Sequence, residues 1–384
     1  MNTEAKLGLY LQIQVLDKNG KIKHDTGRVQ AKCFVSNFVT IWSTILLDGT
    51  RYPYLYRTTG DAGYLTTMAN WDSNSYMWSL INPDSDLCGI VVGTDDTMPV
   101  DYRNINMGNK INDGTNIGEL TYGTMDTSDT PKVLSGGIEW TVFREFTNSS
   151  GGIITVKEIG IISRTDFSQY SLMARDILPA SVAVADSDVM RVGYTFRTEE
   201  GYTLQFLQIL AEIWTWRSKA ALIKQVDGGT VAITATSNWD AAYAPMAARY
   251  GLATYDSDLD GLIVGTGNTP TTLTDYTLET PIVSGDGAGQ LVYGLTQIFA
   301  TQGVQGEDQF KPDANGDMAL LISRVFHNKS GSAITINEIG FLVLYVSSVA
   351  GDQALLARKV LDTPVTIPNN SYKTMLFTFK FPSD

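Results

Sequence analysis

The sequence holds one pattern that could bind a metal ion, a run of alternating aspartates. Asp256, Asp258 and Asp260 precede Gly261. This matches the first half of a calcium loop, in which alternate carboxylates converge on a hard cation where a glycine turns the chain. The twelfth position of such a loop should be a bidentate glutamate, but here it is Gly267. We therefore interpret the segment as a solvated acidic turn, and the three aspartates stay calcium candidates.

Groups suited to nucleophilic or acid–base catalysis are scarce. The chain has two histidines, His24 and His327, and two cysteines, Cys33 and Cys88. Two lone cysteines exclude a disulfide scaffold and a cysteine-built zinc site. Neither histidine comes with a specified serine and carboxylate, as a triad requires, and no pair of carboxylates stands out as the pair of a glycoside hydrolase. We predict no catalytic residue, no cofactor and no enzymatic activity.

Three tyrosines could bind a sugar. Tyr52, Tyr54 and Tyr56 alternate within the segment Arg51–Tyr56, which we expect to form a loop. Aromatic rings in the loops of a β-sandwich often stack on saccharides, so these tyrosines are glycan candidates. The alternative, which we favour, is that they are ordinary packing residues.

The composition limits the class of protein. The 384 residues include 28 Lys+Arg and 41 Asp+Glu, for a formal charge of −13, and 43% are hydrophobic. The apolar content excludes wholesale disorder, and the acidic balance argues against nucleic acid as a partner. The most apolar stretch, around Leu204–Trp216, is too short to span a membrane, so we expect no membrane partner.

The sequence repeats itself in collinear order. Asn70-Trp71-Asp72 returns as Asn238-Trp239-Asp240 at an offset of 168 residues, and later matches lie at offsets of 172, 180 and 183, as insertions in loops would produce. This indicates a tandem duplication. The repeated residues that could carry chemistry are Trp71 and Trp239, Arg144 and Arg324, Glu158 and Glu338, and Arg175 and Arg358. Because Arg and Glu on adjacent strands usually pair and a large Trp usually anchors a core, we interpret this signature as structural.

The elements that must position these residues are mostly strands. Hairpins are predicted on both sides of the turns at Asn148–Gly152 and Asn328–Gly331, and apolar residues at helical spacing predict one amphipathic helix near 34–48 and another near 204–214. The predicted fold is mainly β: tandem duplicated β-sandwich domains, each with one amphipathic helix. We place the boundary near Thr198–Gly201, which gives a first domain over 1–198 and a second over 199–384.

A family resemblance follows from the second repeat. Its motifs are Gly261-Leu-Ile-Val-Gly-Thr-Gly267, Asp275-Tyr-Thr-Leu-Glu279, Arg324-Val-Phe-His-Asn328, Ile334-Thr-Ile-Asn-Glu338, Leu355-Leu-Ala-Arg358 and Pro364-Val-Thr-Ile-Pro368. Together they resemble a module that recurs in structural proteins of tailed bacteriophages. The first repeat resembles it more loosely, since Asp101-Tyr102 lacks the following Leu-Glu and Pro179 stands alone. The motifs are structural, so the resemblance implies a virion component of neck, collar, tail or head without catalytic residues.

The expected function is therefore self-assembly and binding to other virion proteins, in a virion assembled in the host cytoplasm. A homo-oligomer is expected, with a ring as one form: about six chains would present about twelve similar domains and could join a twelve-fold neck to a six-fold tail. Alternatives are a capsid decoration protein and a carbohydrate- or receptor-binding module. Edge strands, with the alternating segment Leu7–Val15 as a candidate, are the expected partner sites.

Overall fold

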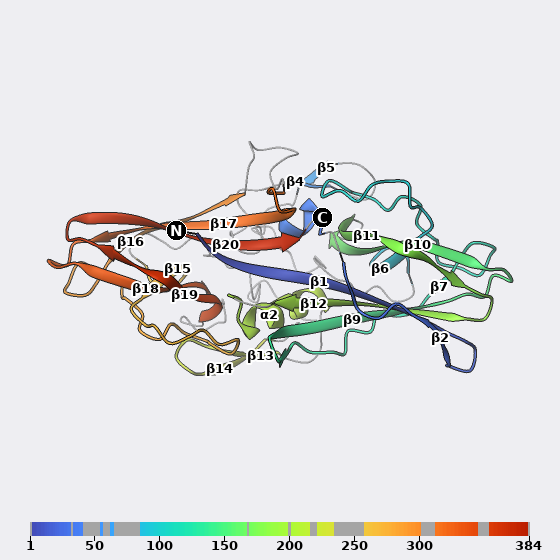
Figure 1. The fold of residues 1–384 in the computed structure, drawn as a ribbon, viewed down its shortest axis with the longest axis horizontal. Helices are drawn as coiled ribbons and strands as arrows, with labels where there is room; N and C mark the ends of the chain where they lie inside the picture. The colour runs from blue at the N-terminus through green and yellow to red at the C-terminus, as the bar shows by residue number, and fades with distance from the viewer. Residues whose placement is uncertain are drawn as a thin grey trace.

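The computed structural model describes residues 2–31, 34–40, 54–56, 62–64, 85–166, 169–198, 201–215, 221–233, 257–300, 312–344 and 353–382. Most of these residues form strands, and the strands form layered sheets (Figure 1). The prediction of a mainly β fold of sandwich type is confirmed.

One large sheet runs through both halves of the sequence. Its strand order is β16 (Val292–Ala300), β17 (Asp317–Asn328), β20 (Ser371–Pro382), β1 (Asn2–Leu16), β12 (Val189–Thr198), β9 (Gly137–Thr147) and β7 (Thr121–Tyr122). Three short strands extend it: β2 (Ile22–Asp25) and β3 (Val29–Gln30) pair with β1, and β8 (Lys132–Leu134) pairs with β9.

A three-stranded sheet covers each end of the large sheet. One has the order β11 (Gln169–Val184), β10 (Ile154–Asp166) and β6 (Gly89–Gly93), and the other β15 (Gly261–Gly265), β18 (Ile334–Leu344) and β19 (Gln353–Ile367). Two-stranded pairs are β13 (Ala221–Lys224) with β14 (Thr230–Ile233) and β4 (Tyr54–Tyr56) with β5 (Ala62–Tyr64). Figure 1 shows the two layered ends on opposite sides, with β1 running between them.

The first strand joins the two ends. Leu7, Leu9, Leu11, Ile13 and Val15 are all at most 2% exposed, and burying each such side chain contributes about 1.5–3 kcal/mol. Residues 7–16 pair antiparallel with β12, while residues 2–6 pair parallel with β20. On their other side, β3 pairs with residues 10 and 11 and β2 with residues 14–16. Leu7–Val15 is therefore not the edge strand that we expected, because alternation shows which face is buried but not which strands lie alongside.

The equivalent strands of the two repeats lie on either side of β1. Tyr194-Thr-Phe196 of β12 corresponds to Phe377-Thr-Phe379 of β20 in the repeated sequence. Because β1 is antiparallel to β12 and parallel to β20, these two strands run in opposite directions. A two-fold rotation between the halves, with β1 near its axis, requires this arrangement. The proposed boundary at residues 198 and 199 stays a prediction, and the sheet is continuous across it.

The structure describes helical residues in both regions where a helix is predicted. α2 spans Leu204–Thr215, close to the predicted 204–214. A helix also begins at Ser36, and the structure describes it as far as Thr40; the remainder of the predicted 34–48 segment lies outside the described residues. Phe34 and Phe38 stack with ring centroids 4.1 Å apart, and both contact Phe381 at the end of β20. Tyr202 and Phe206 likewise contact Phe379. The aromatic core thus also connects the two halves.

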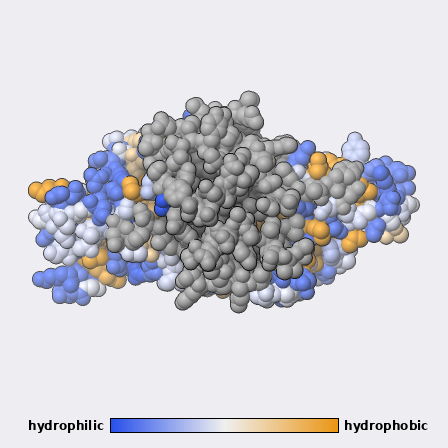
Figure 2. Space-filling model, turned by 180° about the vertical axis from the view of Figure 1, so that it is seen from behind, coloured by the Kyte–Doolittle hydropathy of each residue, from blue (hydrophilic) through white to orange (hydrophobic). Residues whose placement is uncertain are grey.

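The described surface has scattered apolar residues. Figure 2 shows that hydrophobic residues at both ends of this face lie singly among hydrophilic ones. The most exposed large apolar side chains are Ile117, Tyr372 and Ile153, and each lies near a turn or strand end. Single apolar residues of this kind are normal and need no functional explanation.

Candidate functional site

The first pair of repeated arginines ties the two layers of each sandwich together. Arg144 on β9 donates through Nη1 to the carbonyls of Cys88 (2.7 Å) and Ile90 (3.1 Å), and through Nε to Gly123 (2.7 Å). Its guanidinium lies 4.8 Å from the ring centre of Tyr122. A charge this deeply buried is tolerated only because its donors are satisfied.

Arg324 repeats this arrangement in the other half. It donates to the carbonyls of Asp260 and Leu262, both at 3.0 Å, and to Gly294 at 2.7 Å. Its guanidinium lies 4.7 Å from the ring centre of Tyr293. Both arginines are at most 1% exposed. Tyr122 and Tyr293 are not among the predicted residues, although each precedes a glycine and follows a leucine by two positions in both repeats, a signal that identifies them.

A second repeated network holds a buried ion pair. Glu158 on β10 accepts a 2.9 Å hydrogen bond from Nε of Arg175 on β11, and it also accepts the backbone N–H groups of Gly108 and Asn109. Both side chains of the pair are fully buried. Arg175 further donates to the carbonyls of Met98 and Pro99 and to Oδ1 of Asn104. Removing one partner of such a pair would leave an unpaired buried charge, at a cost of about 3–5 kcal/mol.

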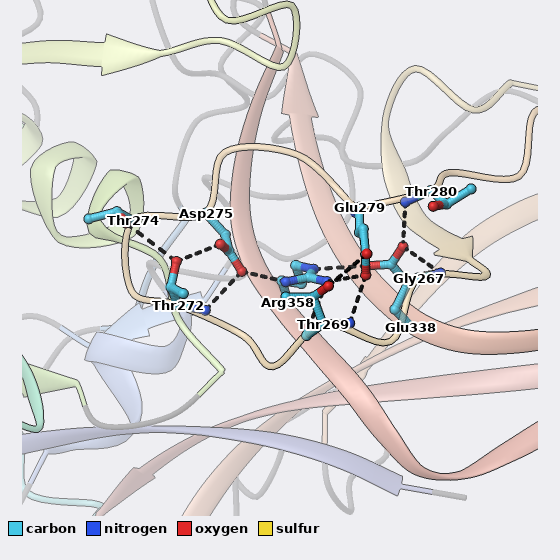
Figure 3. Close-up of polar contacts among 9 residues, drawn as sticks. All are labelled: Gly267, Thr269, Thr272, Thr274, Asp275, Glu279, Thr280, Glu338 and Arg358. Atoms are coloured by element: carbon cyan, nitrogen blue, oxygen red, sulfur yellow. Dashed lines mark hydrogen bonds and ion pairs between the residues drawn. The ribbon is translucent and has the colours of Figure 1, made fainter.

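The corresponding network in the second half is more acidic (Figure 3). Arg358 is 4% exposed and donates to Glu338 (Nε to Oε2, 2.8 Å) and to Asp275 (Nη1 to Oδ2, 2.6 Å). Burial by itself lowers the pKa of Arg358, but the hydrogen bonds to Asp275 and Glu338 raise it above its ordinary value. Asp275 takes the place of the neutral Asn104, which binds Arg175 in the first half. The arginine is thereby fixed as a cation among carboxylates. The sequence comparison, which paired Asp275 with Asp101, is corrected by this geometry.

Glycines leave space for the buried side chains of Glu158 and Glu338. A Cβ on Gly265 would lie 2.6 Å from the carbonyl oxygen of Thr280 and 2.8 Å from Cγ of Glu338, and one on Gly93 would lie 2.7 Å from the carbonyl oxygen of Asn109 and 2.7 Å from Cγ of Glu158. No larger residue fits without moving backbone, so the strands β6 and β15 must carry glycine beside the carboxylate.

Two repeated asparagines are also buried in the structure. Asn148 and Asn328 are 0% exposed. Asn148 donates through Nδ2 to the carbonyls of Gly152 and Val184, both at 2.7 Å, and Asn328 donates to those of Ser332 and Ile367 at the same distance. Each amide oxygen accepts the N–H of the serine two residues later. These side chains hold the hairpin turns against the next strand.

The structure describes only some of the remaining candidate residues. Asp258 accepts the backbone N–H of Ser284 at 2.8 Å, and Asp260 is 2% exposed. Tyr54 and Tyr56 lie on the strand β4, which pairs with β5, and not in the loop that we expected; their side chains lie outside the described part. Trp71, Trp239, Asp256 and Tyr52 lie outside the described residues. Among the residues that the structure describes, no group of three or more His, Cys, Asp or Glu is arranged to hold a metal ion.

A pocket of about 590 Å³ adjoins the acidic network of the second half. Its walls come from α2, from Lys224 at the end of β13, from the loop 269–279 and from Arg358. The lining residues are Leu204, Gln205, Gln208, Lys224, Thr269, Pro270, Thr272, Thr274, Asp275, Tyr276, Thr277, Leu278, Glu279 and Arg358.

Comparison of the chain with protein-family models, curated proteins and solved structures finds no match. In the described part, no helix is long and apolar enough to cross a membrane. The chemistry of the repeated residues must therefore be judged from their geometry. That geometry joins strands and fixes turns.

Proposed function

We propose that this chain is a non-enzymatic structural component of a tailed-phage virion, which acts by self-assembly and by binding other virion proteins. One observation carries the proposal. The six repeated Arg and Glu side chains of these networks are at most 4% exposed, and the sandwich itself supplies their partners; they are Arg144, Glu158 and Arg175 with Arg324, Glu338 and Arg358. Residues kept in two copies for structure, without access to a substrate, fit a building block better than an enzyme.

The topology supports the same function. Residues 2–6 and 7–16 of β1 pair with strands of different halves, so the halves are held in one fixed relation. β12 ends at Thr198 and α2 begins at Leu204, which leaves a short connection. A rigid pair of similar modules is a suitable subunit for a ring, because each chain presents two related surfaces at a constant angle. The resemblance of the motifs to phage structural modules adds a virion as the setting.

The surfaces for assembly are the outer strands of the small sheets. β11 and β19 are terminal strands in the described sheet order. Each carries one exposed proline, Pro179 or Pro364, at a break in its pairing with the neighbouring strand. Proline on an edge limits uncontrolled strand addition. Controlled addition of a partner strand would use the hydrogen-bonding groups next to these prolines.

The test is to find the chain in purified particles. Mass spectrometry of particles from the phage that encodes it should detect the chain at a constant copy number per particle, and gold-labelled antibody should mark one location. Particles from a strain with the gene deleted are the control for the antibody. Absence from purified wild-type particles would contradict the proposal. Labelling over the head surface would select the alternative of a capsid decoration protein.

A further inference from the structure

The carboxylates in the walls of the pocket beside Arg358 already accept hydrogen bonds from the protein. Asp275 accepts hydrogen bonds from the backbone N–H (3.0 Å) and the hydroxyl (2.6 Å) of Thr272 in addition to that from Arg358. Glu279 accepts both the N–H and the hydroxyl of Thr269, at 2.7 and 2.6 Å. The loop 269–279 is thereby fixed in shape (Figure 3). These carboxylates position the wall and have little capacity left for a charged ligand.

One polar side chain of the pocket is incompletely satisfied. Gln205, in the first turn of α2, is 3% exposed. Its Nε2 donates to the carbonyl of Lys224 at 3.5 Å, whereas its Oε1 accepts no hydrogen bond from the described residues. A buried amide oxygen without a donor is unfavourable and rare in native structures. An occupant that donates a hydrogen bond to this oxygen would remove the deficit.

A donor and an aromatic ring lie on the same pocket. The exposed side chain of Lys224 places Nζ 3.7 Å from the ring centre of Tyr276, and both residues line the cavity. Gln208 and Thr277 add neutral hydrogen-bonding groups. The free capacity of the pocket is therefore an acceptor at Gln205, a donor at Lys224 and several groups that can do either.

This combination selects the chemistry of the ligand. A phosphate or carboxylate offers no donor to Gln205, and a cation would be repelled by Lys224. A hydroxyl group both donates and accepts, so a polyhydroxyl compound can satisfy both residues, and apolar C–H faces can pack on Tyr276 and the exposed Pro270. We infer that the pocket binds one or two units of a neutral saccharide.

Two residues of the pocket have different counterparts in the first half. By the repeat alignment, Gln205 corresponds to Asn37 and Lys224 to Tyr56. Nδ2 of the buried Asn37 donates to the carbonyl of Leu172 at 3.2 Å. This inference goes beyond the structural function proposed above and does not depend on it, because an assembled particle and a monomer could both display the pocket.

The experiment is a binding measurement on the full chain. An array of neutral and acidic oligosaccharides is probed first, and glucose, galactose and N-acetylglucosamine are then tested by saturation-transfer NMR. We expect binding to neutral sugars. Gln205→Leu, which keeps the volume but removes the amide, and Tyr276→Ala should each weaken it at least tenfold. Tyr372→Ala is the matched control, because Tyr372 is 74% exposed on β20 and outside the pocket lining.

The inference is overturned if no neutral saccharide binds the wild-type chain at about 10 mM, a level at which even weak sites are occupied. It is also overturned if acidic sugars are preferred, or if binding is unchanged in both pocket variants. Circular dichroism and the unfolding temperature show whether each variant is folded. Gln208→Leu provides a second pocket variant in case Gln205→Leu fails to fold. A loss of binding in Tyr372→Ala equal to that in the pocket variants would also contradict it.

Discussion

At the scale of single residues, each half has one carboxylate facing one glycine, and the two positions are exchanged between the halves. In the first half Asp95 accepts the N–H and hydroxyl of Thr97, and Gly108 faces it. In the second half Glu279 accepts the same groups of Thr269, and Gly267 faces it. A Cβ on Gly108 would lie 2.7 Å from Cγ of Asp95, and one on Gly267 would lie 2.5 Å from Cβ of Glu279. Each site has room for one carboxylate only.

This exchange predicts coupling between two substitutions. Gly267→Asp alone should destabilise the chain by about 1–3 kcal/mol, because the new side chain overlaps Glu279. Glu279→Gly alone should also destabilise it, because Thr269 loses its acceptor. The double variant transplants the arrangement of the first half and should recover at least half of the summed loss in urea unfolding. Gly152→Asp is the control, since a Cβ there meets nothing within 4 Å. Simple additivity would show that the two positions do not share one space.

Asp260 gives a prediction about pH. Burial raises its pKa to about 6, although Arg324 and Ser257 act to lower it. The ordinary value of 3.8 applies in the unfolded chain, so the folded state holds the proton more tightly. The contribution of this carboxyl to stability is therefore fully present below about pH 4 and is lost as the pH rises through about 6.

Asp260→Asn removes that titration. Its free energy of unfolding should exceed that of the wild type by about 1–3 kcal/mol at pH 7, and the difference should vanish near pH 4. Asp260→Cys, which copies Cys88 of the first half, should behave alike. Urea unfolding between about pH 4 and 8 measures the effect. A difference that does not vary with pH would mean that Asp260 titrates normally in the folded chain.

At the scale of elements, the central feature is the double pairing of β1. Ala5 is 1% exposed against β20, and ion pairs of 2.9 Å from Lys6 to Asp317 and 3.0 Å from Lys380 to Glu4 flank it. The five residues 2–6 complete the sheet of the second half, although in sequence they belong to the first half. The C-terminal sandwich therefore depends on the N-terminus of the chain.

Removing residues 1–6 should selectively loosen the second half. Amide hydrogen exchange should accelerate at residues 376–380 of β20, which lose their partner strand, while β12 keeps its pairing with residues 7–16. The control is Glu4→Ala with Lys6→Ala, which removes the partly exposed ion pairs and should cost no more than about 1 kcal/mol. Equal exchange in truncated and full-length protein would show that residues 2–6 contribute no stable pairing.

The sequence predicted the local elements better than their neighbours. Turn residues at Asn148 and Asn328 and the apolar spacing in α2 act over short distances, so the hairpins and the helix could be inferred from adjacent residues. The pairing of residues 2–6 with β20 could not, because backbone hydrogen bonds between strands distant in sequence leave no periodic signal. The repeated Arg and Glu residues predicted where the buried networks lie. The pocket beside Arg358 depends on residues that differ between the repeats, such as Gln205 and Lys224. A comparison of shared residues does not detect such differences.

At the scale of the whole molecule, one continuous sheet joins the two halves of the described chain. The antiparallel directions of β12 and β20 around β1 give it an approximate two-fold arrangement. The formal charge of −13 adds long-range repulsion between free copies of the chain. In the assembly proposed above, the outer strands would be the contact surfaces, and Pro179 and Pro364 would restrict strand addition there.

We propose that this chain assembles with copies of itself into a closed component of a particle. The most direct test is the mass distribution of the purified full chain at micromolar concentration, measured by mass photometry, with negative-stain images of the same sample. We expect one dominant closed oligomer with rotational symmetry. A monomer at every concentration, or open chains of variable length without symmetry, would contradict it.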